Sequence, residues 1–429
     1  MSAAASSTSG GLAAGVTLDP LTGGEAVLPL GDSITYGLGG TSGYRIPLWS
    51  RFFQDGRDLN FVGTQTGGSP EFFSEPEHEG HIGWTVMDLI QFDGGGVEPS
   101  STIEGLLAAS EPEKVLLHIG TNDMLSFDEW HLASKRVGVL LDRIWAVDPR
   151  IAVHLATIVP TGDPSANLSV DWFNDRLREL AHLRYIDGAS IRLVDIATAL
   201  EGIEMADAVH PSPAGYDEMA AQWYEALTTP AQPIPPLQQP PPAVPGLIPT
   251  ASSFMEGHLP DLATNGVGLE GSLHDFEQST QPLGWRSEPF DQVVGEEGYG
   301  VPVSGAPSFQ LRLPTPVDVQ ALELWNGRNV DAGGGVWLNL ESVRSVRVQT
   351  LSGGSGWVDR GVLEFVRGPG RSRAPAERIE VDWPDTLRIR LQVLTTHGNP
   401  ASSPGPLTTP VAISEIQVLG VQAGVVEAQ

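Results

Sequence analysis

Two different rhythms of hydrophobic and polar positions divide the chain. Before residue 228, short continuous apolar runs alternate with amphipathic stretches of helical period. The apolar runs cover residues 26–30, 60–62, 115–119, 151–159 and 191–195, and the helical stretches cover residues 46–54, 85–90, 127–147, 170–183 and 213–227. Buried apolar strands that alternate with helices are typical of a parallel sheet covered on both faces. We therefore predict an α/β domain over residues 23–228, with its ligand site at the carboxyl ends of the strands.

After residue 250 the rhythm changes to short runs of period two. They cover residues 309–313, 321–325, 343–349, 362–366, 378–381, 387–393 and 413–419, and clusters of Gly and Pro separate them. Seven such runs with few helical stretches favour a β-sandwich or jelly roll. We assign residues 251–423 to this all-β domain. Residues 1–22, which are rich in Ala, Ser and Gly, are predicted to form a flexible leader.

A proline-rich segment separates the two rhythms. Nine of the twenty residues from Pro230 to Pro249 are proline. Such a composition favours extended polyproline geometry, so residues 229–250 are predicted to form a semi-rigid spacer between two domains. The alternative is a proline-rich loop inside a single domain.

Composition excludes several classes of function. The net charge of −29 repels nucleic acid and anionic lipid, so neither is an expected partner. The chain contains no cysteine, which excludes disulfides and cysteine nucleophiles, and no apolar run is long enough to cross a bilayer. The first twenty residues lack the basic and apolar regions of a secretory signal. We nevertheless expect secretion, because of the spacer and the β-rich second domain; a removed signal stays open.

The first apolar run turns directly into Gly31-Asp32-Ser33-Ile34-Thr35. A serine just past a buried strand lies at the carboxyl edge of the sheet, where its hydroxyl is exposed and its backbone N–H can help to hold an oxyanion. Taken alone, an Asp-Ser pair after a strand is more often a helix cap or a turn. Further motifs must decide between these interpretations.

Two more motifs follow later strands. Gly120-Thr121-Asn122-Asp123 ends the third run, and Asn122 could direct its side-chain amide toward a developing oxyanion, a contact worth about 3 kcal/mol in serine hydrolases. The alternative is an ordinary Asn-Asp turn. Asp207 precedes His210 by three residues in a loop before the last helical stretch. That spacing lets the carboxylate hold the imidazole Nδ1 and support the imidazolium, so Ser33, His210 and Asp207 form a candidate triad.

Together these blocks resemble the SGNH hydrolase superfamily, and the likeness covers residues 26–227. A central glycine is expected in His78-Glu79-Gly80-His81-Ile82-Gly83-Trp84, at Gly83, with Gly80 as the alternative. The resemblance implies a flavodoxin-like three-layer αβα sandwich. It also implies an oxyanion hole made by the N–H groups of Ser33 and Gly83 and the side chain of Asn122. Glycine is expected there because only glycine lets the backbone N–H come close enough.

Finer features resemble carbohydrate esterase family three, which includes acetyl xylan esterases. They are Gly43-Tyr44-Arg45, Leu48-Trp49, Phe61-Val62-Gly63, the segment from His78 to Trp84, Leu117 to Met124, and His210-Pro211. The implied function is hydrolysis of acetyl or other short acyl esters, on a polysaccharide such as acetylated xylan, without a metal or cofactor. The alternatives are a lipase, arylesterase or thioesterase with a non-binding accessory domain, or a carbohydrate-binding adhesin.

Other polar and aromatic residues near these motifs have two interpretations each. Asp32, Tyr36 and Trp84 are candidates for substrate binding, although each of the two aromatic residues could equally belong to the core. His78 and His81 flank Glu79 and could suggest zinc, but the spacing is one residue short of the zincin pattern and no third ligand stands out.

Two further polar residues are assigned structural roles. His118 lies inside an apolar run and is interpreted as a core residue with satisfied hydrogen bonds. Asp123 is interpreted as a turn residue rather than the triad acid, because Asp207 is better placed in the sequence.

The second domain loosely resembles galactose-binding-like, discoidin-type jelly rolls. The likeness rests on residues 283–287 and 413–418, whereas residues 275–278 replace the usual aspartate-rich opening. Trp325, Trp337 and Trp357 could stack on sugar rings, or could anchor the core and loops instead. Carbohydrate binding by this domain is therefore an expectation from fold analogy.

Overall fold

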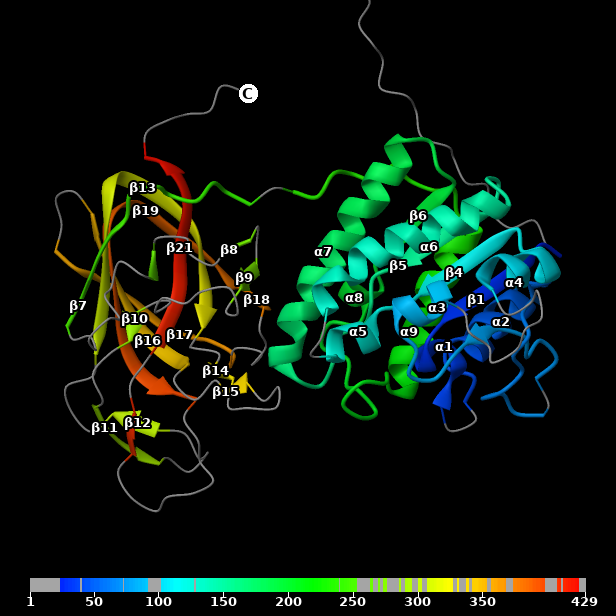
Figure 1. Cartoon of the computed structure of the whole chain (residues 1–429), viewed down its shortest axis with the longest axis horizontal. Coiled ribbons are helices and arrows are strands. Elements are labelled where there is room, and N and C mark those ends of the chain that lie inside the picture. The colour runs from blue at the N-terminus through cyan, green and yellow to red at the C-terminus, as the bar shows by residue number, and fades with distance from the viewer. Residues whose placement is uncertain are drawn as a thin grey trace, which may run out of the picture. The chain divides into compact units, whose positions relative to one another are not determined.

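The computed structural model describes residues 24–38, 41–71, 73–91, 102–126, 129–238, 240–252, 263–264, 269–270, 273–275, 285–286, 290–294, 300–302, 307–326, 330–331, 337–338, 342–352, 356–367, 373–397, 407–409 and 412–423. The chain forms two compact units, and within the proline-rich segment the boundary between them falls between Leu237 and Gln238 (Figure 1). The predicted leader, residues 1–22, lies outside the described residues.

The five apolar runs of the first unit all form strands of one parallel sheet. The strands are β1 (Ala26–Gly31), β2 (Asn60–Phe61), β4 (Lys114–His118), β5 (Ala152–Ala156) and β6 (Ile191–Val194), in the order β2-β1-β4-β5-β6. A short strand, β3 (Glu79–Gly80), pairs with the end of β1 through Leu30 and Gly31. Every residue of β4 and β5 is buried, which explains why these strands appear in the sequence as continuous apolar runs.

Helices cover both faces of this sheet (Figure 1). They are α1 (Ser33–Tyr36), α2 (Arg45–Gln54), α3 (Val86–Gln91), α4 (Ile103–Ser110), α5 (Thr121–Leu125), α6 (Ala133–Val147), α7 (Pro164–Ile186), α8 (Ile196–Ala199) and α9 (Pro213–Thr228). Helices α2, α8 and α9 share one hydrophobic core with the sheet residues Val27 and Leu116. The alternate strand residues Leu28 and Leu117 are equally buried and point to the opposite face. The three-layer αβα prediction is therefore confirmed.

Some helix boundaries differ from the prediction. The predicted stretch 170–183 begins earlier, at Pro164, because proline is tolerated in the first turn of a helix. The stretch 127–147 is a single 3-10 turn, Trp130–Leu132, followed by α6. Helix α4 was not predicted, although Thr102 caps it by accepting a hydrogen bond from the Gly105 N–H at 3.0 Å.

Both ends of the proline-rich segment 229–250 are bonded to the unit that each adjoins. Ile234 is buried in the first unit, and its carbonyl accepts a 2.7 Å hydrogen bond from His182 Nδ1. On the other side, the Val244 N–H donates to the Val418 carbonyl at 2.8 Å. Strand β7 (Ile248–Ala251) then joins the sheet of the second unit. The stretch available as a spacer is therefore shorter than its proline content suggests.

The second unit is an antiparallel β domain. Its main strands are β13 (Ser308–Asn326), β16 (Val343–Ser352), β17 (Val358–Glu364), β19 (Glu377–Thr396) and β21 (Ala412–Gln422). Shorter strands are β8 (Leu269–Glu270), β9 (Leu273–Asp275), β10 (Trp285–Arg286), β11 (Phe290–Val294), β12 (Gly300–Pro302), β14 (Val330–Asp331), β15 (Trp337–Leu338), β18 (Arg373–Pro375) and β20 (Leu407–Thr409). The predicted β-sandwich is confirmed. Its core contains Phe309, Leu311, Val346, Ile389 and Leu391, among others.

Two pairs of predicted strands are single long strands. Runs 309–313 and 321–325 both belong to β13, and runs 378–381 and 387–393 both belong to β19. The pairing of β13 with β19 skips from Arg312 to Val317, across Pro314 and Pro316. Proline cannot donate to the ladder, so the strand passes these residues through a bulge instead of ending there.

The three tryptophans considered as sugar contacts have different surroundings. Trp325 is 2% exposed and belongs to the core. Trp357 is half-buried, and its ring lies 4.0 Å from the Arg390 guanidinium carbon. The side chain of Trp337 and all of residues 276–284 lie outside the described residues. In the described residues, no helix is both long enough and apolar enough to cross a membrane.

Candidate active site

Ser33 lies at the carboxyl edge of the sheet, directly after β1, and begins helix α1. Asp32 is the N-cap of this helix, and its Oδ1 accepts a 2.9 Å hydrogen bond from the Ile34 N–H. The helix-cap interpretation is therefore correct for Asp32, while the role of Ser33 as a nucleophile stays a prediction. Ser33 is 6% exposed.

The structure brings Ser33, His210 and Asp207 together in a chain of hydrogen bonds. Ser33 Oγ lies 2.9 Å from His210 Nε2. His210 Nδ1 lies 2.9 Å from Asp207 Oδ2 and 3.1 Å from Asp207 Oδ1. A carboxylate can only accept, so Nδ1 carries the proton and Nε2 is free to accept from the serine hydroxyl. This is the tautomer that a general base needs.

The loop that carries His210 is held in place by its own backbone. Met205 forms an isolated antiparallel bridge with Pro211, and the Ala206 N–H donates to the His210 carbonyl at 2.8 Å. Asp207 Oδ1 also accepts from the N–H groups of Val209, at 2.7 Å, and His210, at 2.8 Å. The carboxylate is therefore positioned before it meets the imidazole ring.

The same bonds set the charge of Asp207. Partial burial works to raise its pKa, but the backbone N–H groups of His210 and Val209 and the imidazole outweigh it and lower the pKa to about 2. Asp207 is thus ionised throughout the neutral range. A fixed negative charge at this position favours the imidazolium that forms when His210 takes a proton.

Asn122 lies in α5, after the neighbouring strand β4, and its amide is held by the segment that contains Gly83. Asn122 Nδ2 donates to the Trp84 carbonyl at 2.8 Å. A primary amide has two N–H donors, so one proton orients the group and the second is available to a ligand. The side chain is thus held in one orientation, and its role toward an oxyanion stays a prediction.

The two candidate glycines of segment 78–84 differ in what requires glycine. Gly83 is exposed and has φ +80°, while a Cβ built on it would meet no atom within 4 Å. Within the protein its requirement is therefore conformational, and the expected close approach of its N–H to an oxyanion stays a prediction. Gly80 is buried in β3, where a Cβ would lie 2.4 Å from the Tyr36 backbone nitrogen. Gly80 is needed for the close packing of β3 against α1.

The three predicted substrate-binding residues are packed into the protein to different degrees. Asp32 is fully buried, and burial, only partly offset by its bond to Ile34, raises its pKa to about 7. Its Oδ2 has no hydrogen bond of ordinary geometry, although the Thr121 hydroxyl lies nearby. Tyr36 is half-buried, and its ring packs edge-on against His78 at 5.6 Å. Asp32 is thus a buried cap and is not exposed to a substrate.

The third of these residues, Trp84, is part of an arrangement that the sequence did not reveal. The Trp84 ring stacks on His81, with 3.8 Å between ring centroids and 11° between planes. His81 Nε2 donates to the buried Glu79 carboxylate at 2.9 Å, and Glu79 Oε1 accepts from the Thr64 N–H. Within the His-Glu-x-His segment, Glu79 thus holds His81, and the His81 ring stacks on Trp84, whose carbonyl binds Asn122. Among the described residues, no group of His, Asp and Glu has the arrangement of a metal site.

His78 is committed elsewhere in the same segment. Its Nε2 donates to the Gly67 carbonyl at 2.9 Å, and its Nδ1 accepts from the Gly80 N–H at 2.8 Å. Burial, with a smaller contribution from Arg45, lowers the pKa of His78 to about 3, so the ring is neutral. Neither nitrogen is available to a zinc ion in this arrangement.

Arg45 is a second residue that sequence reasoning missed as part of the site. The side chain is buried and donates to the Thr35 and Tyr36 carbonyls at 3.1 and 2.9 Å, and to the Pro76 carbonyl at 2.7 Å. It therefore caps the carboxyl end of α1, the helix that Ser33 begins. The sequence signals were its place in the family-like segment Gly43-Tyr44-Arg45 and at the start of an amphipathic helix, and neither indicates burial.

Residues 30–218 match the sequence model described as the GDSL-like Lipase/Acylhydrolase family. The first unit is a GDSL-like lipase/acylhydrolase domain. The chain is also 28% identical over 223 residues to a protein of Ruminococcus flavefaciens named "Multidomain esterase". The match covers 47% of this chain but only 28% of that relative. The resemblance to SGNH hydrolases is therefore confirmed for this domain.

Solved structures similar to each unit are also known. A Clostridium thermocellum family 3 carbohydrate esterase has 27% sequence identity and a TM-score of 0.39, and the match covers 47% of this chain and 94% of that one. An F5/8 type C domain from Bacteroides fragilis has 16% identity and a TM-score of 0.26, and the match covers 41% of this chain and 93% of that one.

Two polar residues of the GDSL-like domain complete the site's surroundings. Asp123 Oδ2 accepts from the Val86 N–H at 2.9 Å and so holds the start of α3, while burial raises its pKa to about 6. His118 is fully buried, as expected, but neither ring nitrogen has a hydrogen-bond partner in the described part of the chain. The expectation of a satisfied core histidine is therefore wrong. Burial keeps the ring neutral by lowering its pKa to about 4.

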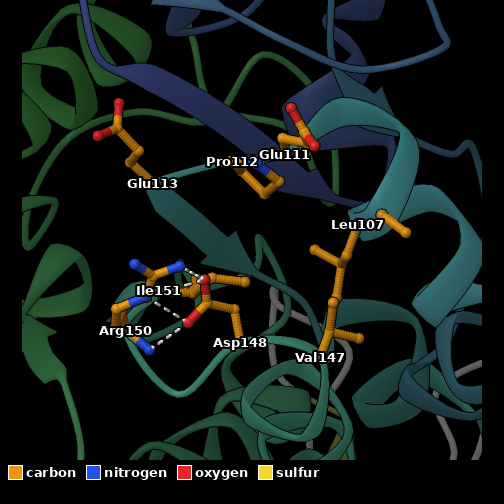
Figure 2. Close-up of a pocket in the computed structure, with 9 residues that line it drawn as sticks. Leu107, Glu111, Pro112, Glu113, Val147, Asp148, Arg150 and Ile151 are labelled. Atoms are coloured by element: carbon orange, nitrogen blue, oxygen red, sulfur yellow. Dashed lines mark hydrogen bonds and ion pairs between the residues drawn. The ribbon is translucent and has the colours of Figure 1, made fainter.

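The GDSL-like domain also has a hollow of about 600 Å³, far from this chemistry (Figure 2). Glu113 and Ile151, which line it, directly precede β4 and β5, so it lies at the amino ends of the strands. Ser33 lies at the opposite, carboxyl edge. Figure 2 shows Arg150 and Asp148 bonded to each other across part of its wall, at 2.7 Å. The hollow therefore adds no group to the candidate active site, because it lies at the opposite edge of the sheet.

Proposed function

We propose that the chain is a serine esterase that removes acetyl or other short acyl groups from a polysaccharide such as acetylated xylan. The observation that carries the proposal is the 2.9 Å contact between Ser33 Oγ and His210 Nε2, with Asp207 bonded to the other ring nitrogen. The GDSL-like lipase/acylhydrolase domain and the esterase relative support the same reaction class. A polysaccharide substrate would be met outside the cell, so secretion belongs to this proposal.

The first half of the reaction forms an acyl-enzyme. His210 Nε2 takes the hydroxyl proton while Ser33 Oγ attacks the ester carbonyl. The oxyanion that develops is held by the backbone N–H groups of Ser33 and Gly83 and by the second N–H of Asn122. His210 then gives its proton to the ester oxygen of the leaving sugar as the C–O bond breaks, so the sugar departs with a free hydroxyl. Asp207 stays ionised throughout and stabilises the imidazolium.

The second half repeats these roles with water. His210 takes a proton from a water molecule, which attacks the acyl carbonyl on Ser33, and the same donors hold the second oxyanion. Collapse returns the proton from His210 to Ser33 Oγ and releases the short acid. No residue beyond these five groups is needed for the proton and charge balance of either half.

The acyl and alcohol parts of the substrate rest on different arguments. Preference for a short acyl group follows from the likeness of segments 78–84 and 117–124 to carbohydrate esterase family three. The polysaccharide follows from that likeness and from the presence of a second, all-β unit. Hydrolysis of long-chain p-nitrophenyl esters faster than the acetate would instead favour the lipase alternative.

Ser33→Ala tests the nucleophile directly. We expect acetate release from acetylated xylan and p-nitrophenyl acetate hydrolysis to fall by at least about 10³-fold, with an unchanged unfolding curve. Ser110→Ala is the matched control, because its hydroxyl bonds only to the Leu106 carbonyl within α4, at 2.8 Å. Retained hydrolysis in Ser33→Ala would sink the proposal, whatever the control does.

A further inference from the structure

The outer face of the second unit carries a cluster of arginines that is unusual for so acidic a chain. Strand pairing places Arg312 beside Arg388, and Gln310 and Gln349 on either side of Arg390. One step along the strands, Arg347 lies beside Gln392. We call these seven side chains, together with Trp357, the arginine platform.

Burial shows which way the platform points. The alternate residues on the same strands, such as Leu311, Val348 and Ile389, are completely buried in the core of the unit. Because successive side chains of a strand point to opposite faces, the platform faces away from that core. Arg312, Arg347 and Arg388 are exposed, and Arg390 is half-buried.

The charge of the platform is opposite to that of the chain. The whole sequence has 53 acidic and 24 basic residues, whereas the platform has four arginines. The carboxylate that pairing places beside it is Asp359, 3.9 Å from Arg347. In the described part of the chain, no carboxylate lies within ion-pair distance of Arg312 or Arg388. At physiological ionic strength charges beyond about 8 Å are screened, so a nearby anion experiences the platform more than the distant acidic surface.

One of these arginines is already held in a fixed orientation. The Arg390 guanidinium lies over the Trp357 ring at 4.0 Å and donates to Gln349 Oε1 at 3.2 Å. Ordering a long side chain before a ligand arrives lowers the entropy cost of binding. A planar guanidinium can then bind a carboxylate through two parallel hydrogen bonds.

We propose that the arginine platform binds an anionic polysaccharide through the carboxylates of its uronate residues. The amides of Gln310 and Gln392, and the hydroxyl of Thr250 next to Gln310, suit sugar hydroxyls. The exposed apolar side chains beside the platform lie at its edges, with Ile248 next to Arg312 and Val362 next to Arg347. This disfavours a protein partner, whose interface would have an apolar centre. The choice of a polysaccharide over other polyanions rests on the proposed function; the anion site itself does not.

Binding of polygalacturonate by the full chain, measured by isothermal titration calorimetry, tests this proposal. We expect binding to polygalacturonate, none to its fully methyl-esterified form, and a loss of binding between about 0.1 M and about 1 M salt. Equal binding to both polymers would overturn the proposal, as would the absence of binding to polygalacturonate. Tighter binding to single-stranded DNA than to polygalacturonate would also overturn it.

Variants assign the binding to the platform. Arg312→Gln combined with Arg388→Gln should weaken polygalacturonate binding on the order of tenfold, since each removes one exposed charge-assisted contact. The matched control combines Arg150→Gln and Arg378→Gln, two arginines outside the platform that have their own acidic partners. An equal loss in both double variants would show a non-specific charge effect and would refute the assignment. If the platform variant instead changed the oligomeric state, the platform would be a contact with a second copy of the chain, and the assignment would be refuted.

The catalytic proposal is kept separate by Ser33→Ala. That variant should bind polygalacturonate like the unmodified chain, even though it no longer hydrolyses acetyl esters. Lost hydrolysis with retained binding supports both proposals. Retained hydrolysis by Ser33→Ala would refute the catalytic proposal alone. Undetectable binding of polygalacturonate would refute the proposal for the platform alone.

Discussion

The fully buried carboxyl group of Asp32 makes the stability of the GDSL-like domain depend on pH. Burial, the largest effect, raises its pKa from 3.8 to about 7. The folded state therefore keeps the proton up to about pH 7, while the unfolded chain releases it near pH 4. Because the folded state binds more protons in this window, the free energy of unfolding falls as the pH rises from about 4 to about 7.

The size of this effect follows from the shift. A change of about three pKa units corresponds to about 4 kcal/mol, which is lost between about pH 4 and about pH 7 and changes little above that range. Asp32→Asn removes the ionisation but keeps an oxygen that can accept from the Ile34 N–H. The variant should therefore gain stability over the unmodified chain as the pH rises, by up to about 4 kcal/mol at about pH 8.

Urea unfolding from about pH 5 to about pH 8, followed by helical circular dichroism, measures the difference, because the second unit is all-β and contributes little to that signal. Asp148→Asn is the control. Its carboxylate is exposed, and the hydrogen bonds from Arg150 lower its pKa, so its removal gives no gain at high pH. Parallel pH profiles for Asp32→Asn and the unmodified chain would refute the reasoning, as would a variant that is less stable at every pH.

Four more substitutions test the geometry around the proposed oxyanion. Asn122→Ala should lower kcat by about 10²–10³-fold with a nearly unchanged unfolding curve. A change in KM with an unchanged kcat would contradict this. Gly83→Ala should cost only about 1–2 kcal/mol of unfolding free energy, because the positive φ strains an alanine there but its Cβ would touch no other atom. Gly80→Ala should cost more, because its Cβ would lie 2.4 Å from the Tyr36 backbone nitrogen. Glu79→Gln should lower kcat about tenfold and destabilise the domain by about 1–3 kcal/mol, and unchanged steady-state kinetics would contradict a positioning role.

The sheet and the order of its motifs could be predicted because each depends on local patterns. A strand buried on both faces is apolar along its whole length, and a polar residue directly after it lies at the carboxyl edge. That reasoning placed Ser33 and Asn122 at the same edge without any knowledge of distances. The Asp207 and His210 spacing was equally local, since both residues belong to one loop.

What could not be predicted depends on contacts between distant segments. The spacing of His78, Glu79 and His81 suggested a metal site, but His81 instead stacks on Trp84 and bonds to Glu79. These contacts hold the segment that positions Asn122. Nothing in the local sequence of Arg45 shows that carbonyls from α1 and residue 76 surround its guanidinium. The unsatisfied ring of His118 is a further example, because hydrogen-bond partners come from the fold and not from the strand.

Segment 78–84 contacts or supplies each part of the proposed oxyanion hole. β3 pairs with the end of β1, and the His81 N–H donates to the Gly31 carbonyl at 2.9 Å, two residues before Ser33. The same segment supplies Gly83, and through the Trp84 carbonyl it orients Asn122. The relative positions of the three donors thus depend on one short stretch of backbone. Buried Glu79 anchors that stretch through its hydrogen bond with His81, so it positions the oxyanion donors without touching the substrate.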